Sequence, residues 1–407
     1  MLYIYMIFSL LCGIISILGD HLGVMMLDYA LFCLFIFISL FKLKGKLVVP
    51  RSYLIILTIY IIVLTINAYI SPYTMGLKYV AIGAISTMMP FILYITSYNY
   101  LLTDSQLSKL IDAWIHFVLF MCGIAIMETL FFPSSYTIES SILKISIIKH
   151  GFFASICNQG VILSLYQFAS KHNLKYRNIA IALTIAAVLT VQLKVIIGLL
   201  LIWMLYALTM SENKQRSKVF ILMFSLAIFA IPVIINIPAL ASKIDKYINL
   251  YGGENAYENV ARPALYYQAI KIANDFCPLG SGQGTFGSIP VNMVYNPIYY
   301  DYGLSEIHGL GETGDNFKMD THWSNILGEN GYLGTLLYLM LFCYPLRYLK
   351  KMRNLTHHQS TKFLFIAVII VVMFESLTLC IPGRMAFMFI YAGILSILCR
   401  KISTTQL

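Results

Sequence analysis

Charged side chains are scarce in this sequence, and this scarcity excludes a water-soluble protein. Only 11% of the 407 residues are Asp, Glu, Lys or Arg, whereas 59% are hydrophobic. The mean hydropathy of +0.78 lies well above that of soluble domains. A helix that crosses a bilayer needs roughly 20 apolar residues, and such stretches recur along nearly the whole chain. The composition therefore predicts a protein held mostly within a membrane.

Polar segments contain almost no cysteine. Seven of the 8 cysteines lie inside or at the ends of apolar stretches, where they act as small hydrophobic side chains. Only Cys277 lies in a polar segment, so the cysteines imply no disulfide framework and no metal cluster. The first apolar stretch has no basic residue before it, and a second follows almost at once. We therefore expect a retained helix rather than a signal peptide.

The apolar stretches predict an all-α polytopic membrane protein with about 12 transmembrane helices. The expected spans lie at about residues 2–19, 22–41, 52–69, 78–96, 111–131, 151–169, 179–192, 195–210, 219–242, 331–348, 363–380 and 385–399. The chain would then consist of spans one to nine (1–242), a large loop or cap (243–330), and spans ten to twelve with the C-terminal segment (331–407).

The basic residues predict the orientation of these helices. Short loops rich in Lys and Arg stay in the cytoplasm, and most of the 28 basic residues fall on that side when both termini are cytoplasmic. The loop at 243–330 is acidic overall and would lie in the periplasm, as part of a bacterial inner-membrane protein. The net charge of +10 then reports topology and contact with membrane lipid. We expect no nucleic acid partner.

A glycine-rich turn lies within this loop, with Gly280, Gly282 and Gly284 at every second position. It superficially resembles a phosphate-binding loop. However, it is not bracketed by a strand and a helix, and no Lys-Ser/Thr pair follows it, so we expect no nucleotide site. Glycine lets a backbone approach a ligand or a membrane helix closely, and it also permits a plain tight turn. Both interpretations stay open from the sequence.

His322 and Glu329 are candidates for acid–base chemistry. They lie seven residues apart, so a helix would bring both to one face. An imidazole beside a carboxylate at the edge of a membrane cavity is a reasonable general base. A histidine that only caps an interfacial helix is the alternative. We expect no metal, because the spacings of the nearby ligand types match no known pattern. These residues are His308, Asp315, Asp320 and His322.

Several segments occur in a characteristic order. Arg262 precedes an amphipathic helix, and the pattern Pro-Leu-Gly-x-Gly-x-Gly-x-Phe follows from Pro278. His322 comes next, and then a Glu-x-Gly-x-x-Gly pattern that enters an apolar span. Upstream, the segment 149–153 and Asn158 open another helix. In this order, and in its large outer loop late in a twelve-helix chain, the sequence resembles the O-antigen polymerase and O-antigen ligase superfamily.

This resemblance implies an enzyme that needs neither metal nor cofactor. It would move glycan from an undecaprenyl diphosphate carrier to an acceptor hydroxyl. The resemblance also implies that Arg262, Lys194 and Lys149 bind the diphosphate. His322, with Glu329 on the same helix face, would assist the acceptor hydroxyl. Cations aimed at a diphosphate leaving group agree with this chemistry, because charge-assisted hydrogen bonds are strong.

Two departures from the family pattern leave alternatives open. The family usually has arginine where Lys194 stands; lysine offers a point charge rather than a planar fork, and an interfacial lysine can also serve topology alone. The interval from His322 to Gly331 is shorter than in many members. This interval puts Asp320 at the register of the family histidine, so either Asp320 or His322 is the candidate that faces the substrate.

Glu128 and Glu375 are rare intramembrane acids, which suggests function. Structural pairing with Lys149 or Arg384 is the alternative.

We expect a polymerase that lengthens a lipid-linked surface polysaccharide. Its partners would be undecaprenyl-diphosphate-linked oligosaccharide, membrane lipid and a polysaccharide chain-length regulator. A ligase that transfers finished polymer to lipid A-core shares the same architecture and is the closest alternative. A polysaccharide flippase or other transporter is the alternative from a non-enzymatic class, although transporters tend to show inverted repeats and charged midplane residues.

Overall fold

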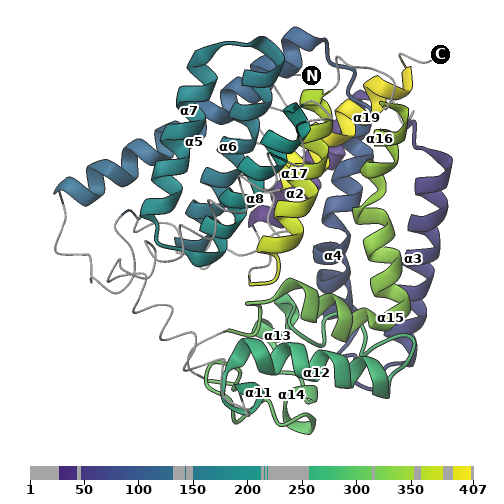
Figure 1. Ribbon diagram of the computed structural model, residues 1–407. Coiled ribbons are helices and arrows are strands. Elements are labelled where there is room, and N and C mark those ends of the chain that lie inside the picture. Colours follow the sequence, from purple (N-terminus) through teal and green to yellow (C-terminus); the bar gives the residue numbers. More distant parts are fainter. Residues whose placement is uncertain are drawn as a thin grey trace.

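The computed structural model describes residues 27–43, 47–131, 143, 150–211, 215, 218, 256–313, 317–352, 359–378 and 388–404. All regular secondary structure in these ranges is helical. Long helices lie side by side in a bundle, and a group of short helices and turns covers one end of it (Figure 1). The expected all-helical fold class is confirmed for the described part of the chain.

Four described helices are long and apolar enough to cross a membrane. They are α3 (Arg51–Ile70), α4 (Leu77–Tyr98), α5 (Asp104–Phe131) and α8 (Leu193–Met210). The bent pair formed by α15 (His322–Phe342) and the segment Tyr344–Lys351 gives a fifth, with an angle of 52° between its parts. The protein therefore has the transmembrane character that its composition predicts.

The other helices of the bundle follow the expected order, but within the described residues each is too short or too polar to count as a span on its own. They are α2 (Leu27–Lys42), α6 (His150–Lys171), α7 (Leu174–Leu189), α17 (Gln359–Glu375), the π-helix η4 (Phe389–Ile394) and α19 (Leu395–Thr404). The expected spans at 2–19 and 219–242 lie outside the described residues. The number of 12 spans stays a prediction.

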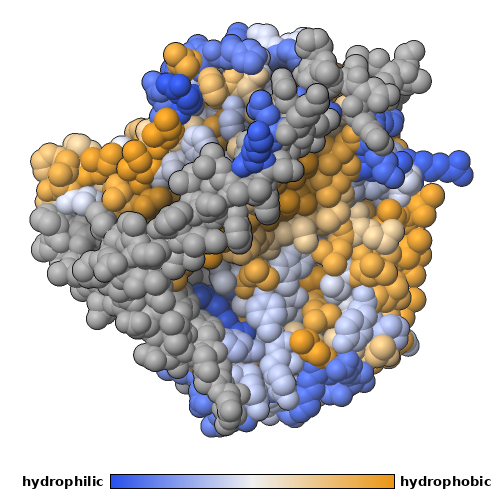
Figure 2. Space-filling view, viewed as in Figure 1, coloured by the Kyte–Doolittle hydropathy of each residue, from blue (hydrophilic) through white to orange (hydrophobic). Residues whose placement is uncertain are grey.

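Helix α3 has one face buried inside the bundle and another face exposed on its outer surface. Tyr53, Leu57, Tyr60 and Leu64 recur every three or four residues and are buried against other helices. Large hydrophobic side chains on the remaining surface of α3, including Ile62, are exposed. Figure 2 shows such apolar residues on the bundle and more hydrophilic residues on the covering segment. Exposed apolar surface of this extent is typical of contact with lipid.

The covering segment, residues 256–313 with 317–321, is called the cap below. Its helices are α11 (Ala256–Asn259), α12 (Ala261–Asp275), α13 (Ile289–Met293) and α14 (Ile298–Asp301). The cap has a small hydrophobic core of its own, which includes Leu265, Ile272, Phe286, Tyr299 and Leu310. Helix α12 packs against α15. The cap is therefore a folded unit attached to the bundle.

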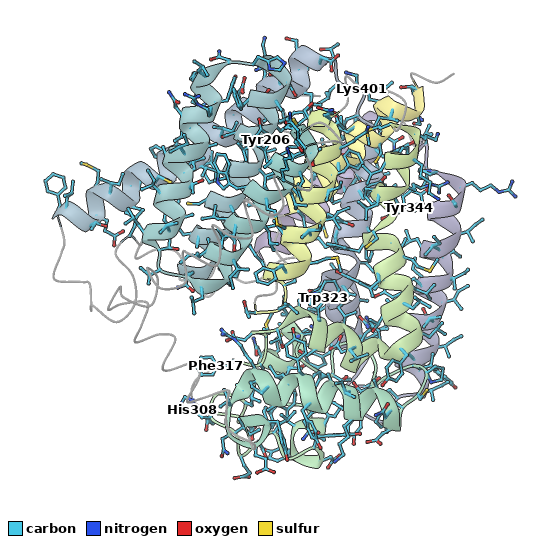
Figure 3. The ribbon with its side chains drawn as sticks, viewed as in Figure 1. Tyr206, His308, Phe317, Trp323, Tyr344 and Lys401 are labelled. Atoms are coloured by element: carbon cyan, nitrogen blue, oxygen red, sulfur yellow. The ribbon has the colours of Figure 1, made fainter. Side chains whose placement is uncertain are left out.

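The bundle end opposite the cap carries many of the basic residues. There Lys401 pairs with Asp104, Lys171 pairs with Asp112 at 3.3 Å, and Arg347 donates to the hydroxyl of Tyr344 at 2.6 Å. Figure 3 places Lys401 and Tyr344 at this end, His308 and Phe317 in the cap, and Trp323 between the two. The segregation of charge agrees with a cytoplasmic basic end, whose membrane side stays a prediction.

Helix α15 is broken at Gly331, and the cap contacts the bundle at this break. Gly331 has φ 60° and ψ −165°. This backbone conformation lies outside the helical region, and residues that carry a side chain rarely adopt it. A Cβ atom on Gly331 would lie 2.5 Å from the carbonyl oxygen of Pro278. The backbone N–H of Leu333 donates to that same oxygen at 3.1 Å. The cap turn thus occupies the break, and this interlock requires glycine at position 331.

Candidate active site

The glycine-rich turn is a packing element between two membrane helices. Gly280, Gly282, Gly284 and Gly287 all have φ between 69° and 98°, where glycine is strongly favoured. A Cβ atom on Gly284 would lie 2.8 Å from the carbonyl oxygen of Tyr79 in α4. A Cβ atom on Gly280 would collide with backbone atoms at the break in α15. Of the two sequence interpretations, the structure shows close approach to membrane helices.

Glu329 lies at the centre of this interlock. Its side chain is completely buried, and its Oε1 atom accepts hydrogen bonds from the backbone N–H of Phe286 at 3.0 Å and from the hydroxyl of Ser288 at 2.5 Å. Its backbone carbonyl accepts from Gly282 N–H at 3.0 Å and from the Asn67 amide at 2.6 Å. Glu329 therefore fastens the glycine turn to α15, which is a structural task that its sequence pattern did not reveal.

His322 begins α15 and points into the protein. Its side chain is 4% exposed, and its Nε2 atom lies 3.0 Å from the hydroxyl of Tyr338, which is 16 residues further along α15. The neighbouring Trp323 donates from its indole N–H to the carbonyl of Met373 at 2.9 Å. Residues 322–330 of α15 are helical, so His322 and Glu329 share a face as expected. Seven residues of helical rise nevertheless separate them by about 10 Å.

Arg262 and Asp320 form an ion pair at the junction of cap and bundle. Arg262 Nη2 lies 3.1 Å from Asp320 Oδ2, and about a third of each side chain is exposed, 30% and 32%. Arg262 comes from the first turn of α12, and Asp320 lies two residues before α15 begins. Two residues that the resemblance assigned to diphosphate binding and to the catalytic register thus meet in one accessible place.

Lys194 adds a second cation to this junction. It lies in the first turn of α8, is half-buried, and interacts electrostatically with Glu375, Arg262 and Asp320. Figure 2 shows hydrophilic surface in a hollow between the apolar bundle and the cap. Helix α8, helix α12 and the segment just before α15 supply two cations and one accessible carboxylate. The cations can hold a multiply charged anion, and the carboxylate can accept a proton from a hydroxyl beside that anion.

Helix α12 is tied to the bundle beside this cluster. One turn beyond Arg262, the hydroxyl of Tyr266 donates to the carbonyl of Leu377 at 2.8 Å. Burial raises the pKa of Tyr266 to about 12, while the nearby Arg262 charge opposes that rise. The phenol therefore stays protonated at neutral pH and keeps its hydrogen bond. Because Leu377 follows α17, this contact holds Arg262 near the same bundle end as Lys194.

Lys149, Asp315 and Arg384 fall outside the described residues. His308 lies in the cap, with its ring centroid 5.8 Å from that of Phe317. Within the described ranges, no three His, Cys, Asp or Glu side chains are grouped as metal ligands.

Sequence reasoning missed two features that shape the site. Tyr338 contacts His322 from 16 positions along the chain, and nothing in the spacing of the two residues signals that contact. The sequence flagged Glu375 as a rare acid, yet its described electrostatic partner is Lys194, whereas Lys149 and Arg384 were the expected partners.

No protein-family model matches the chain, and no curated protein matches it either.

Proposed function

We propose that this protein is a metal-independent glycosyltransferase that acts at the periplasmic face of the inner membrane on undecaprenyl-diphosphate-linked oligosaccharide. The proposal is supported mainly by one observation: Arg262 and Asp320 form an ion pair where the cap joins the bundle, and Lys194 lies within electrostatic range of both. Such a junction suits a substrate with an apolar tail in the bilayer and a charged, sugar-bearing head outside it.

The two cations suit a diphosphate leaving group. The guanidinium of Arg262 offers paired N–H donors that match phosphate oxygens, and the ammonium of Lys194 adds a compact point charge. Both charges would be aimed at the oxygen that gains negative charge as the sugar leaves, where fixed charges lower the barrier most. Charge-assisted hydrogen bonds of this type contribute about 1.5–3 kcal/mol each.

Asp320 is the better candidate for the general base. It is accessible and lies beside the cations, whereas His322 is buried against Tyr338. A diphosphate that takes over the contact with Arg262 would release the Asp320 carboxylate. That carboxylate then accepts the proton of the acceptor hydroxyl, the acceptor oxygen bonds to the anomeric carbon, and the bond from that carbon to the diphosphate oxygen breaks. The lipid diphosphate leaves with the electron pair.

Polymerase is the reaction that we assign, with undecaprenyl-linked repeat units as both donor and acceptor. A lipopolysaccharide gel of a strain that lacks the gene tests this assignment. Lipid A-core with a single attached unit is expected, because the separate ligase still transfers one block. Bare core, with accumulation of lipid-linked polymer, would instead assign the protein as the ligase. Unchanged polysaccharide would contradict both activities.

A further inference from the structure

Helices α8 and α17 pack closely one turn below Lys194. Gly198 lies four residues after Lys194 in α8, so both occupy one face of the helix. A Cβ atom on Gly198 would lie 2.9 Å from the Nδ2 atom of Asn158 and 3.6 Å from the Oε1 atom of Glu375. The glycine therefore leaves room for a polar pair, from α6 and α17, directly beneath the lysine.

Glu375 is held firmly in that position. It is the last residue of α17 and only 3% exposed. Its Oε1 atom accepts a hydrogen bond from the Asn158 amide at 2.7 Å, and Ser155 on the same helix supplies another. Burying a carboxylate away from water costs free energy unless hydrogen bonds and an opposite charge offset that cost. Asn158 and Ser155 provide the hydrogen bonds.

Lys194 provides the opposite charge. Lys194 interacts electrostatically with Glu375, whose Oε1 atom lies against Gly198 one helical turn away, and also with Arg262 and Asp320. The neighbouring Arg262 repels the ammonium, while the two carboxylates attract it. The two cations of the site thus have different partners: Arg262 pairs with the accessible Asp320, and Lys194 stands above the buried Glu375.

We propose that Glu375 is a positioning residue that holds the Lys194 ammonium at the junction, facing the diphosphate. This inference rests on the proposed function for the identity of the ligand. An incoming anion can displace Asp320 from Arg262, since about a third of each side chain in that ion pair is exposed. It cannot displace Glu375, which α6 fixes inside the bundle. Glu375 thereby counteracts the repulsion between the two cations and keeps the second one in place when no substrate is bound.

The first test measures the charge at position 194 without reference to any reaction. In a Lys194→Cys variant in membranes, the modification rates by an anionic and a cationic methanethiosulfonate reagent are compared by mass spectrometry of the peptide that contains the introduced thiol. Adding Glu375→Gln should raise the anionic-to-cationic rate ratio at least about threefold, because a unit charge so close acts through little water. Glu128→Gln, a change to the other intramembrane acid, is the matched control. An unchanged ratio would overturn the pairing.

The second test asks whether Glu375 acts through Lys194. Surface polysaccharide is quantified for Lys194→Met, Glu375→Gln and the double variant at matched protein level. Lys194→Met should reduce product on the order of 10- to 100-fold, as expected for loss of a charge-assisted contact. Glu375→Gln should reduce product in the same direction, and the double variant should be no worse than Lys194→Met. Lys194→Arg and Glu375→Asp, which keep the charges, should each recover part of the product.

The outcomes separate this inference from the function on which it rests. Additive losses in the double variant would show that Glu375 acts independently of Lys194, and would overturn the positioning role even if the protein is a polymerase. A raised modification ratio, together with unchanged polysaccharide in the strain without the gene, would keep the charge pair but overturn the diphosphate assignment. A raised ratio with a non-additive cycle supports the proposal.

Discussion

Two polar clusters lie at the two ends of one short helical segment, residues 322–330 of α15, and they differ in kind. At the far end, the Glu329 carboxylate is buried and is hydrogen-bonded by Phe286 and Ser288. At the near end, Arg262 and Asp320 are each about one-third exposed, with Lys194 nearby. Buried, compensated polar groups usually hold a fold together, whereas accessible charges are available to a ligand. We call the first the anchor cluster and the second the charged cluster.

The largest effect is expected from reporter fusions, whose all-or-none activity reports the side of the membrane on which both clusters lie. A reporter that is active only outside the cytoplasm should work when fused near Asn296, in the cap, and fail when fused near Gln215. The reason is the accumulation of basic residues in the loops at the opposite bundle end. Enzymatic activity of the reporter in whole cells is the measurement. The reverse pattern would place both clusters in the cytoplasm.

The next largest effect separates Asp320 from His322. Asp320→Asn should lower polymer formation by about 10²–10⁴-fold at normal protein level, since it removes the proposed general base. His322→Ala should be mild in rate and should mainly lower protein level, because it empties a buried position against Tyr338. Asp301→Asn, an exposed cap carboxylate bonded to Tyr73, is the control. A severe rate loss in His322→Ala with normal protein level would restore His322 as the base.

Arg262 should give a somewhat smaller loss. Arg262→Ala removes the proposed donors to the leaving diphosphate and should reduce product by about 10²–10³-fold. Arg262→Lys should recover only part, because a point charge cannot make the paired contact. Lys271→Ala, a change to an exposed base on the same helix α12, serves as control. Product measured at matched protein level decides; full activity of Arg262→Ala would remove Arg262 from the site.

The anchor cluster should respond in stability rather than in chemistry. Gly331→Ala would place a Cβ atom against the cap turn and force a strained backbone, at a cost of about 1–3 kcal/mol from the backbone alone. The detergent-solubilised protein should unfold at a lower temperature than the wild type, as measured by a thermal unfolding assay. Gly303→Ala is a useful comparison, since Gly303 also has positive φ but no neighbour within 4 Å of an added Cβ. Equal losses in the two variants would show that backbone strain, and not the interlock, accounts for the effect.

The smallest effect expected is that of Tyr338→Phe. This variant keeps the ring packed against Phe91, with ring centroids 4.9 Å apart, and removes only the hydroxyl that meets His322. Loss of such a hydrogen bond costs about 1–3 kcal/mol when the partner stays buried. Stability should fall by this amount while polymer formation stays near wild type. A rate loss as large as that of Asp320→Asn would instead link Tyr338, and through it His322, to the chemistry.

The fold class could be predicted from sequence, because a lipid-facing helix needs an apolar run that is visible without any tertiary information. The expected start of the tenth span at residue 331 coincides with the break in α15, since hydropathy changes where the chain leaves the cap. Hydropathy did not show that the helix already begins at His322, before the break. Periodicity placed His322 and Glu329 on one face, but it carries no information about partners from other segments.

The charged cluster was harder to predict for the same reason. Motif order points to Arg262, Lys194 and Asp320 one by one, but their proximity depends on the packing of α8, α12 and α15, which lie far apart in the sequence. Glu375 was noticed only as a rare acid. Its neighbours Asn158 and Lys194 come from two other helices, and no local pattern links the three.

The interlock between cap and bundle has an evolutionary consequence. At Gly280, Gly331 and Gly83 the atoms nearest to an added Cβ all belong to backbone, and at Gly284 the nearest is the backbone oxygen of Tyr79. A clash with a side chain can be relieved by a smaller residue at the partner position, but a clash with backbone cannot. No substitution at a partner position can therefore compensate for a lost glycine, and the glycine at each of these positions must be kept on its own account. Sequence divergence around the cap should leave these four glycines in place while the side chains between them change.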